Sequence, residues 1–205
     1  MTPNHSAKIE ELSSLLTMSK AKGFLGREFL TWLWFQSELA DSLHLDLKDG
    51  STATCRIWID DRVVLESSAA KAHIYSLRGG EPSQSIETAA ALQSGKMAKQ
   101  LKIGIDIDDV GEFTAVLNAQ DLTPRSLSLP TLANQDASQG TPADTAAAEP
   151  LILRLQQTEL FLNVLDALFS LFLDERTDAK WEDVGVEKIR TWIKTRSTVE
   201  KADLH

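Results

Sequence analysis

Basic residues are the part of this sequence whose type and spacing best suit a chemical task. Lys96, Lys99 and Lys102 lie within seven residues of one another. A second basic group surrounds Trp192 near the end of the chain and consists of Lys188, Arg190, Lys194 and Arg196. Either group can contact a phosphate backbone, and the indole can stack on a base. A solvated charged face around a buried Trp is the alternative, and both interpretations stay open.

The motifs of the common enzyme classes are missing from the sequence. It contains no G-x-S-x-G elbow, no phosphate-binding P-loop and no G-x-G-x-x-G. Ser68 and Lys71 have the S-x-x-K spacing, but the motifs that support it in enzymes are absent. We therefore expect a protein without catalytic activity and without a cofactor.

Metal binding is also weakly supported. None of the four histidines pairs with another histidine or with the cysteine at ligand spacing. The acidic segment DIDDVGE fails the EF-hand pattern, because Val110 and Leu117 occupy positions that need oxygen ligands. We interpret this segment as a solvated turn between two strands. Cys55 lies in a predicted strand, where we expect a packing role.

The 205-residue chain is acidic, with a formal net charge of −9 and a pI of about 4.9. This balance argues against a chain that is basic all over, but it leaves room for a local basic face. A single cysteine and the lack of a signal-peptide pattern predict a cytoplasmic protein. The most apolar stretch, residues 151–173, contains Arg154, Glu159 and Asp166, so we expect no membrane span.

Periodicity predicts an α+β fold, with a mainly antiparallel sheet in a domain over residues 1–130. From about residue 43 to 130 the apolar period is two, which is typical of a meander of short strands. Helical spacing predicts three helices, at about 6–20, 26–41 and 83–94. A tight turn is expected at Asp60–Asp61, between two of the strands.

Beyond this domain, residues 131–149 contain almost no large apolar side chain, so we expect a flexible linker. Residues 150–197 are predicted to form a helical C-terminal segment. Its apolar residues step by four and three, as in a coiled-coil seam. The seam includes Leu155, Leu162, Leu165, Phe169 and Phe172. We expect it either to pack on the first domain or to drive self-association.

The segment GREFLTWLWF, residues 26–35, concentrates four aromatic side chains in one predicted helix. Its apolar residues lie on most sides of that helix, which indicates burial on more than one side. We interpret it as a core helix, with a subunit interface as the second interpretation. A catalytic pocket is disfavoured, because no set of acids, bases or metal ligands accompanies it.

The order of the segments carries one resemblance. The apolar helix FLGREFLTWLWF is followed by DDRVVLE and then by LQSGKMAKQLKIGIDIDDVGEFTAVLNAQDLTPRSLSLP. This succession resembles the C-terminal half of the RdgC family of recombination-associated proteins, over about residues 24–195 without the linker. The resemblance implies a nucleoid protein that binds duplex DNA without sequence preference and catalyses no reaction. Lys96 is the one basic candidate that falls on a matching motif position.

Two functions therefore stay open at this stage. The first is a recombination-associated protein that binds duplex DNA through the basic residues. The second is an acidic interaction or assembly protein, whose apolar C-terminal helix binds a protein partner or a second copy of the chain.

Overall fold

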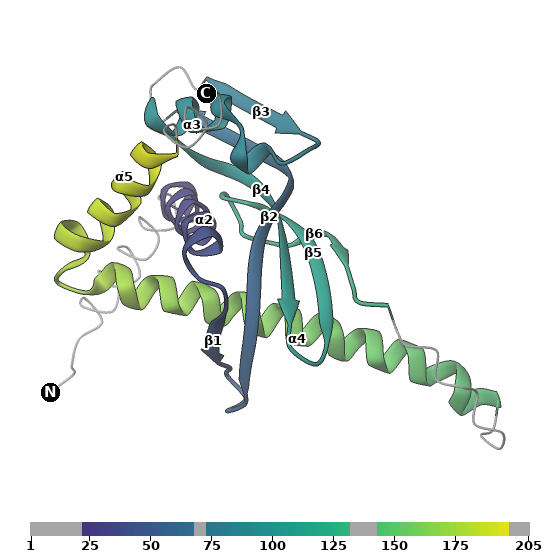
Figure 1. Ribbon diagram of the computed structural model, residues 1–205. Coiled ribbons are helices and arrows are strands. Elements are labelled where there is room, and N and C mark those ends of the chain that lie inside the picture. Colours follow the sequence, from purple (N-terminus) through teal and green to yellow (C-terminus); the bar gives the residue numbers. More distant parts are fainter. Residues whose placement is uncertain (1–21, 68–72, 132–142, 197–205) are drawn as a thin grey trace, which may run out of the picture.

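The computed structural model describes residues 22–67, 73–131 and 143–196. Its centre is an antiparallel six-stranded sheet with the order β1-β2-β4-β5-β6, while β3 pairs with β2 off this path (Figure 1). The strands are β1 (Leu43–Asp46), β2 (Thr52–Ser67), β3 (Ile74–Arg78), β4 (Lys96–Ile107), β5 (Gly111–Asn118) and β6 (Arg125–Ser128). Helices pack on this sheet, so the predicted α+β class is confirmed.

The helices lie before, within and after the sheet. They are α2 (Lys22–Leu39), α3 (Ile86–Gln93), α4 (Ala143–Thr177) and α5 (Val186–Thr195). A 3₁₀ turn, η1 (Pro82–Gln84), precedes α3, and a π turn, η2 (Trp181–Gly185), precedes α5. The helix predicted at 6–20 lies outside the described residues. Over the described ranges, no helix has both the length and the apolar composition needed to cross a membrane.

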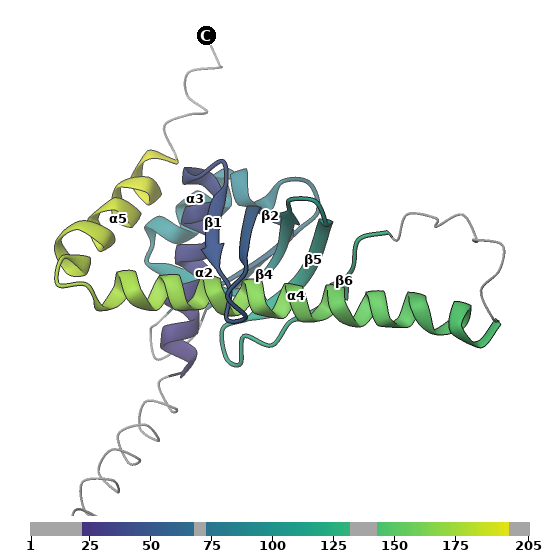
Figure 2. The ribbon, with the colours of Figure 1, turned by 90° about the horizontal axis from the view of Figure 1, so that it is seen from below.

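One face of the sheet is covered by α2 and α4 (Figure 2). Alternation along the strands points Ile57, Ile105 and Phe113 toward this face, and all three are buried. Phe161 of α4 stacks on Phe113, with ring centroids 5.6 Å apart. The opposite face carries half-exposed polar side chains such as Lys102, as expected for an antiparallel sheet with one packed face.

Helix α2 is the central element of the core. Every side chain from Phe29 to Gln36 is buried, which confirms the interpretation of this segment as a core helix. Phe29 contacts Phe172 of α4 with ring centroids 5.5 Å apart. Gly26 lets the helix approach the sheet closely, because a Cβ at this position would lie 1.9 Å from the carbonyl oxygen of Ala119.

The predicted tight turn at Asp60–Asp61 is wrong. The segments on either side of it form one long strand, β2, which pairs with β4 on both sides of an irregularity between Ile59 and Val63. Because β4 continues alongside, the chain stays extended and absorbs its extra residues in a bulge. Lys102 of β4 contacts both carboxylates, at 2.9 Å from Asp60 and 3.2 Å from Asp61.

The predicted helix at 83–94 is divided in two. Ser85 separates η1 from α3, because its side chain caps α3 by accepting a hydrogen bond from the Thr88 amide at 3.1 Å. A residue in this role has extended rather than helical backbone, so the helix begins only after it.

The predicted linker, residues 131–149, is helical in its last part. Residues 132–142 lie outside the described ranges, but α4 begins at Ala143 and continues through Pro150 without interruption. The segment is rich in alanine, which has the highest helix propensity of any residue, so a lack of large apolar side chains does not prevent a helix here. The helix that was expected to begin near residue 150 is therefore longer at its N-terminal end.

Candidate interaction surfaces

Helix α4 has two parts with different surroundings. Its C-terminal half belongs to the core, where Phe161, Val164, Leu168 and Phe172 are fully buried. Its N-terminal half projects beyond the sheet (Figures 1 and 2). Four large apolar side chains on α4 remain exposed to solvent. Their exposed fractions are 62% for Leu151, 52% for Ile152, 60% for Leu155 and 44% for Leu162. We call Leu151, Leu155 and Leu162 the α4 stripe, because they lie within roughly 40° of one another around the helix, whereas Ile152 lies on the adjacent side.

The predicted seam is therefore not one continuous contact. Leu165 and Phe172 are buried and Phe169 is partly buried against Phe29, with ring centroids 5.1 Å apart. Leu155 and Leu162 belong instead to the exposed α4 stripe. The reason is a rotation, because the buried face is centred on Phe161 and its neighbours, roughly a third of a turn around the helix from Leu155.

Polar contacts at the end of α4 fix its core half to α2. The indole of Trp32 donates a hydrogen bond to Glu175 at 2.8 Å. One turn further along α2 toward its start, Glu28 forms an ion pair with Arg176 at 2.6 Å. These bonds hold one end of α4 rigidly, so the projecting half continues a fixed helix.

A second polar cluster attaches α5 to α2. The two oxygens of Glu38 each accept an indole hydrogen bond of 2.8 Å, one from Trp34 and one from Trp192. Arg196 forms an ion pair with the same carboxylate, and its guanidinium carbon lies 4.9 Å from each indole ring. The Arg196 side chain is only 7% exposed, so this cation is enclosed by protein.

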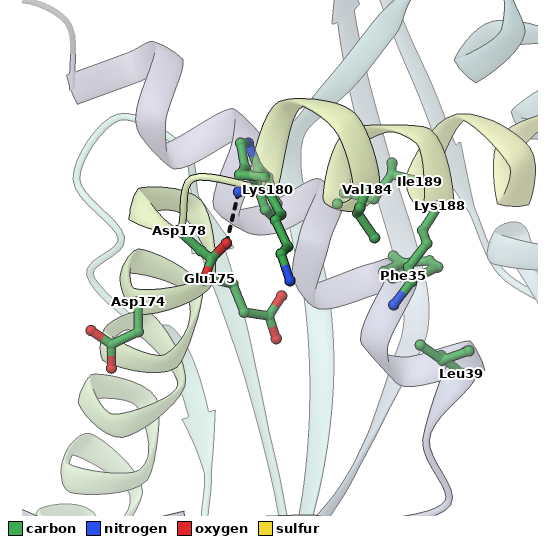
Figure 3. Close-up of a pocket in the computed structure, with 11 residues that line it drawn as sticks. Phe35, Leu39, Asp174, Glu175, Asp178, Lys180, Val184, Lys188 and Ile189 are labelled. Carbon is green, nitrogen blue, oxygen red and sulfur yellow. Dashed lines mark hydrogen bonds between the residues drawn. The ribbon is translucent and has the colours of Figure 1, made fainter.

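A groove runs between the end of α2 and the segment formed by η2 and α5. It comprises two adjoining hollows of about 430 and 630 Å³ that share Phe35, Leu39, Val184 and Lys188. Figure 3 shows side chains that line the first hollow, among them Lys188, acidic residues of α4 and the apolar Phe35 and Leu39. The side chains that line the groove include no His, Cys or Ser.

The candidate lysines of β4 are engaged within the chain. Lys99 forms an ion pair of 2.6 Å with Glu66, which also binds Arg27. Lys102 binds the two aspartates of the β2 bulge, and the hydrogen bond that it donates to Asp60 is the main cause that raises the pKa of Lys102. Lys96 donates to the hydroxyl of Ser94 at 3.0 Å. The structure thus gives two of the three lysines carboxylate partners.

The basic candidates of α5 do not form one cluster either. Lys188 lines the groove, and Arg190 forms an ion pair of 2.6 Å with Glu187. Lys194 is exposed on the last turns of α5. Trp192 packs edge-on against Phe35, with ring centroids 5.6 Å apart, so its ring is occupied by contacts within the chain.

Cys55 is fully buried in β2, as its expected packing role requires. Burial raises the pKa of its thiol to about 11, and the charge of Asp108 acts in the same direction. The thiolate needed for nucleophilic chemistry is therefore disfavoured at neutral pH. Among the residues that the structure describes, no three His, Cys, Asp or Glu side chains are grouped to hold a metal ion.

No protein-family model matches the chain, and neither a curated protein nor a solved structure was found to match it.

Two features of these surfaces were missed in the sequence. Ile152 was not included in the seam, although it adjoins Leu151 in an apolar stretch. Glu38 was not recognised as a link between helices. An acid four residues after Trp34, on the same helical face, is the one local signal for it.

Proposed function

We propose that this chain is a non-catalytic interaction or assembly protein, and that the projecting half of α4 binds an apolar surface on a protein partner. The observation that supports the proposal is the α4 stripe. Leu151 and Leu155 are exposed on the projecting half of a helix whose other half is fixed in the core, and Leu162 continues the stripe at the start of that core half. Contiguous exposed apolar surface of this kind is characteristic of protein–protein contacts.

The charges favour a protein partner over DNA. Lys99 and Lys102 hold carboxylates of Glu66, Asp60 and Asp61, and a phosphate would have to displace these partners. The chain also carries a formal net charge of −9, which repels a polyanion at long range. DNA binding and membership of the RdgC family stay predictions from the resemblance.

A photo-reactive amino acid at position 155 tests the proposal inside cells. The matched control is position 156, because Gln156 is also exposed but lies roughly 100° further around the same helix. We expect a defined covalent protein adduct from position 155 and none from position 156. The adduct should disappear when Leu162→Glu is added, because a charge then lies in the contact. Equal labelling at both positions, or none at 155, would contradict the proposal.

A further inference from the structure

Together with Thr158, the leucines of the α4 stripe have the spacing of a coiled-coil core. Leu151, Leu155, Thr158 and Leu162 follow one another at intervals of four, three and four residues. In a heptad these positions are d, a, d and a, which form the contact between two helices. The three leucines are the large exposed members of the series, and Thr158 is half-buried. Along the helix they extend over about 16 Å.

Opposite charges flank this core at matched positions. Arg154 occupies the g position and Glu159 the following e position, five residues later. Both side chains are exposed on α4, and neither forms an ion pair with another described residue. In a parallel two-stranded coiled coil, the g residue of one helix faces the e residue of the next heptad on the other. An antiparallel pair would instead bring g opposite g and e opposite e, so Arg154 and Glu159 would not face each other.

We infer that the partner of the α4 stripe is a second copy of this chain, bound parallel and in register. This inference rests on the proposed function and adds the identity and the orientation of the partner. Arg154 of each chain then faces Glu159 of the other, on both sides of the leucine core. The contact covers fewer than the three or four heptads of a stable isolated coiled coil, so the dimer is expected to be weak and concentration-dependent.

Cysteine cross-linking tests the register directly. Cys55 is fully buried with a raised pKa, so its own thiol contributes little background. In a parallel, in-register pair, Leu155→Cys places two thiols opposite each other across the core. We expect this variant to form a disulfide-linked dimer in mild oxidant, and Gln156→Cys to form no disulfide-linked dimer under the same conditions.

Charge reversal tests the orientation. Arg154→Glu alone and Glu159→Arg alone each place like charges across both flanks, which should raise the dimer dissociation constant on the order of tenfold. The double variant R154E/E159R restores opposite charges and should recover the affinity. In an antiparallel pair the double variant would gain nothing over the single ones, so failure of this rescue would overturn the parallel arrangement.

Sedimentation of the full chain over a concentration series separates this inference from the proposed function. A dimer that Leu155→Glu abolishes, with helix content unchanged in circular dichroism, is the expected result. A wild-type chain that stays monomeric, together with no cross-link from Leu155→Cys, would overturn the second copy as partner. In that case a photo-adduct with a different protein would still support the proposed function. The absence of any adduct at position 155 would contradict both the second copy as partner and the proposed function.

Discussion

The indole nitrogen of Trp192, on α5, lies 2.8 Å from a carboxylate oxygen of Glu38, near the end of α2. The other oxygen of Glu38 accepts the indole hydrogen bond of Trp34, and Arg196 supplies the balancing charge. One carboxylate therefore joins the last described helix to the central helix of the core. Glu38 also lines the second hollow of the groove between them.

Replacement of Glu38 with Ala should loosen α5. The variant leaves two indole donors and the enclosed guanidinium of Arg196 without their acceptor, which should lower the free energy of unfolding by about 1–3 kcal/mol. Chemical denaturation measures the loss, and Trp fluorescence in the native state reports the altered surroundings of Trp34 and Trp192.

Glu187→Ala is the matched control for that experiment. It also removes the carboxylate partner of an arginine, but the Glu187 and Arg190 side chains are 54% and 61% exposed. Exposed ion pairs of this kind contribute about 0–1 kcal/mol to the free energy of unfolding. An equal loss of stability in the two variants would show that the Glu38 cluster is no more than a surface ion pair.

Trp32→Ala should be among the most destabilising single changes in the chain. Its ring is fully buried against Phe172, at 5.6 Å between centroids, and truncation of a buried aromatic typically costs about 3–5 kcal/mol. Leu39→Ala, on the same helix, is the control because Leu39 is 63% exposed. Thermal unfolding should separate the two variants clearly, and a Trp32→Ala protein with an unchanged melting temperature would contradict the core role of α2.

The fold class could be predicted from local patterns, whereas the division of α4 could not. The apolar residues of β2 and β4 alternate with a period of two, because one face of each strand packs on the core. This pattern can be seen within each strand alone. The exposure of Leu155 depends instead on which side of α4 the sheet covers and on how far the sheet extends beneath the helix. Leu165 and Leu162 have the same chemistry and the same seam spacing, so only the position of the neighbouring elements distinguishes them.

The bulge in β2 is a second feature that local sequence patterns could not predict. Two adjacent aspartates interrupt the alternation, and a turn is the usual local reason for such a pair. Whether the chain reverses there depends on its partner strand, and β4 extends past both residues with Lys102 between their carboxylates. The Glu38 cluster also unites residues more than 150 positions apart, which no local pattern encodes.

Cys55 should make the stability of the chain fall at alkaline pH. Its pKa is about 11 in the folded chain and near its ordinary value of 9 when unfolded. Between these values the unfolded chain releases a proton that the folded chain keeps, so unfolding becomes more favourable as pH rises. We expect the stability difference between wild type and Cys55→Ala to be constant below about pH 8 and to shrink between about pH 9 and 11. A difference that stays constant over the whole range would contradict the burial of this thiol.

The RdgC resemblance predicts weak binding of duplex DNA without sequence preference, with an affinity that falls steeply as salt is raised. Lys96 is the most informative of the three β4 lysines for a DNA-binding test, because it donates a hydrogen bond to a hydroxyl and not to a carboxylate. If it contacts phosphate, Lys96→Ala should weaken binding to every sequence equally and reduce the salt slope by about one. Absence of a complex at roughly 50 mM salt with micromolar protein would leave only the protein-partner proposal.

Leu162 and Leu165 should respond differently to the same substitution, although they are three residues apart in one helix. Leu165 is 9% exposed and belongs to the core, so Leu165→Glu buries a charge without a partner and should destabilise the fold by several kcal/mol. Leu162 is 44% exposed in the α4 stripe, so Leu162→Glu should leave the melting temperature of the isolated chain nearly unchanged and reduce self-association. Circular dichroism and sedimentation of both variants provide the two measurements. Loss of helix content in Leu162→Glu would place this side chain in the core, and unchanged association in that variant would place the contact elsewhere.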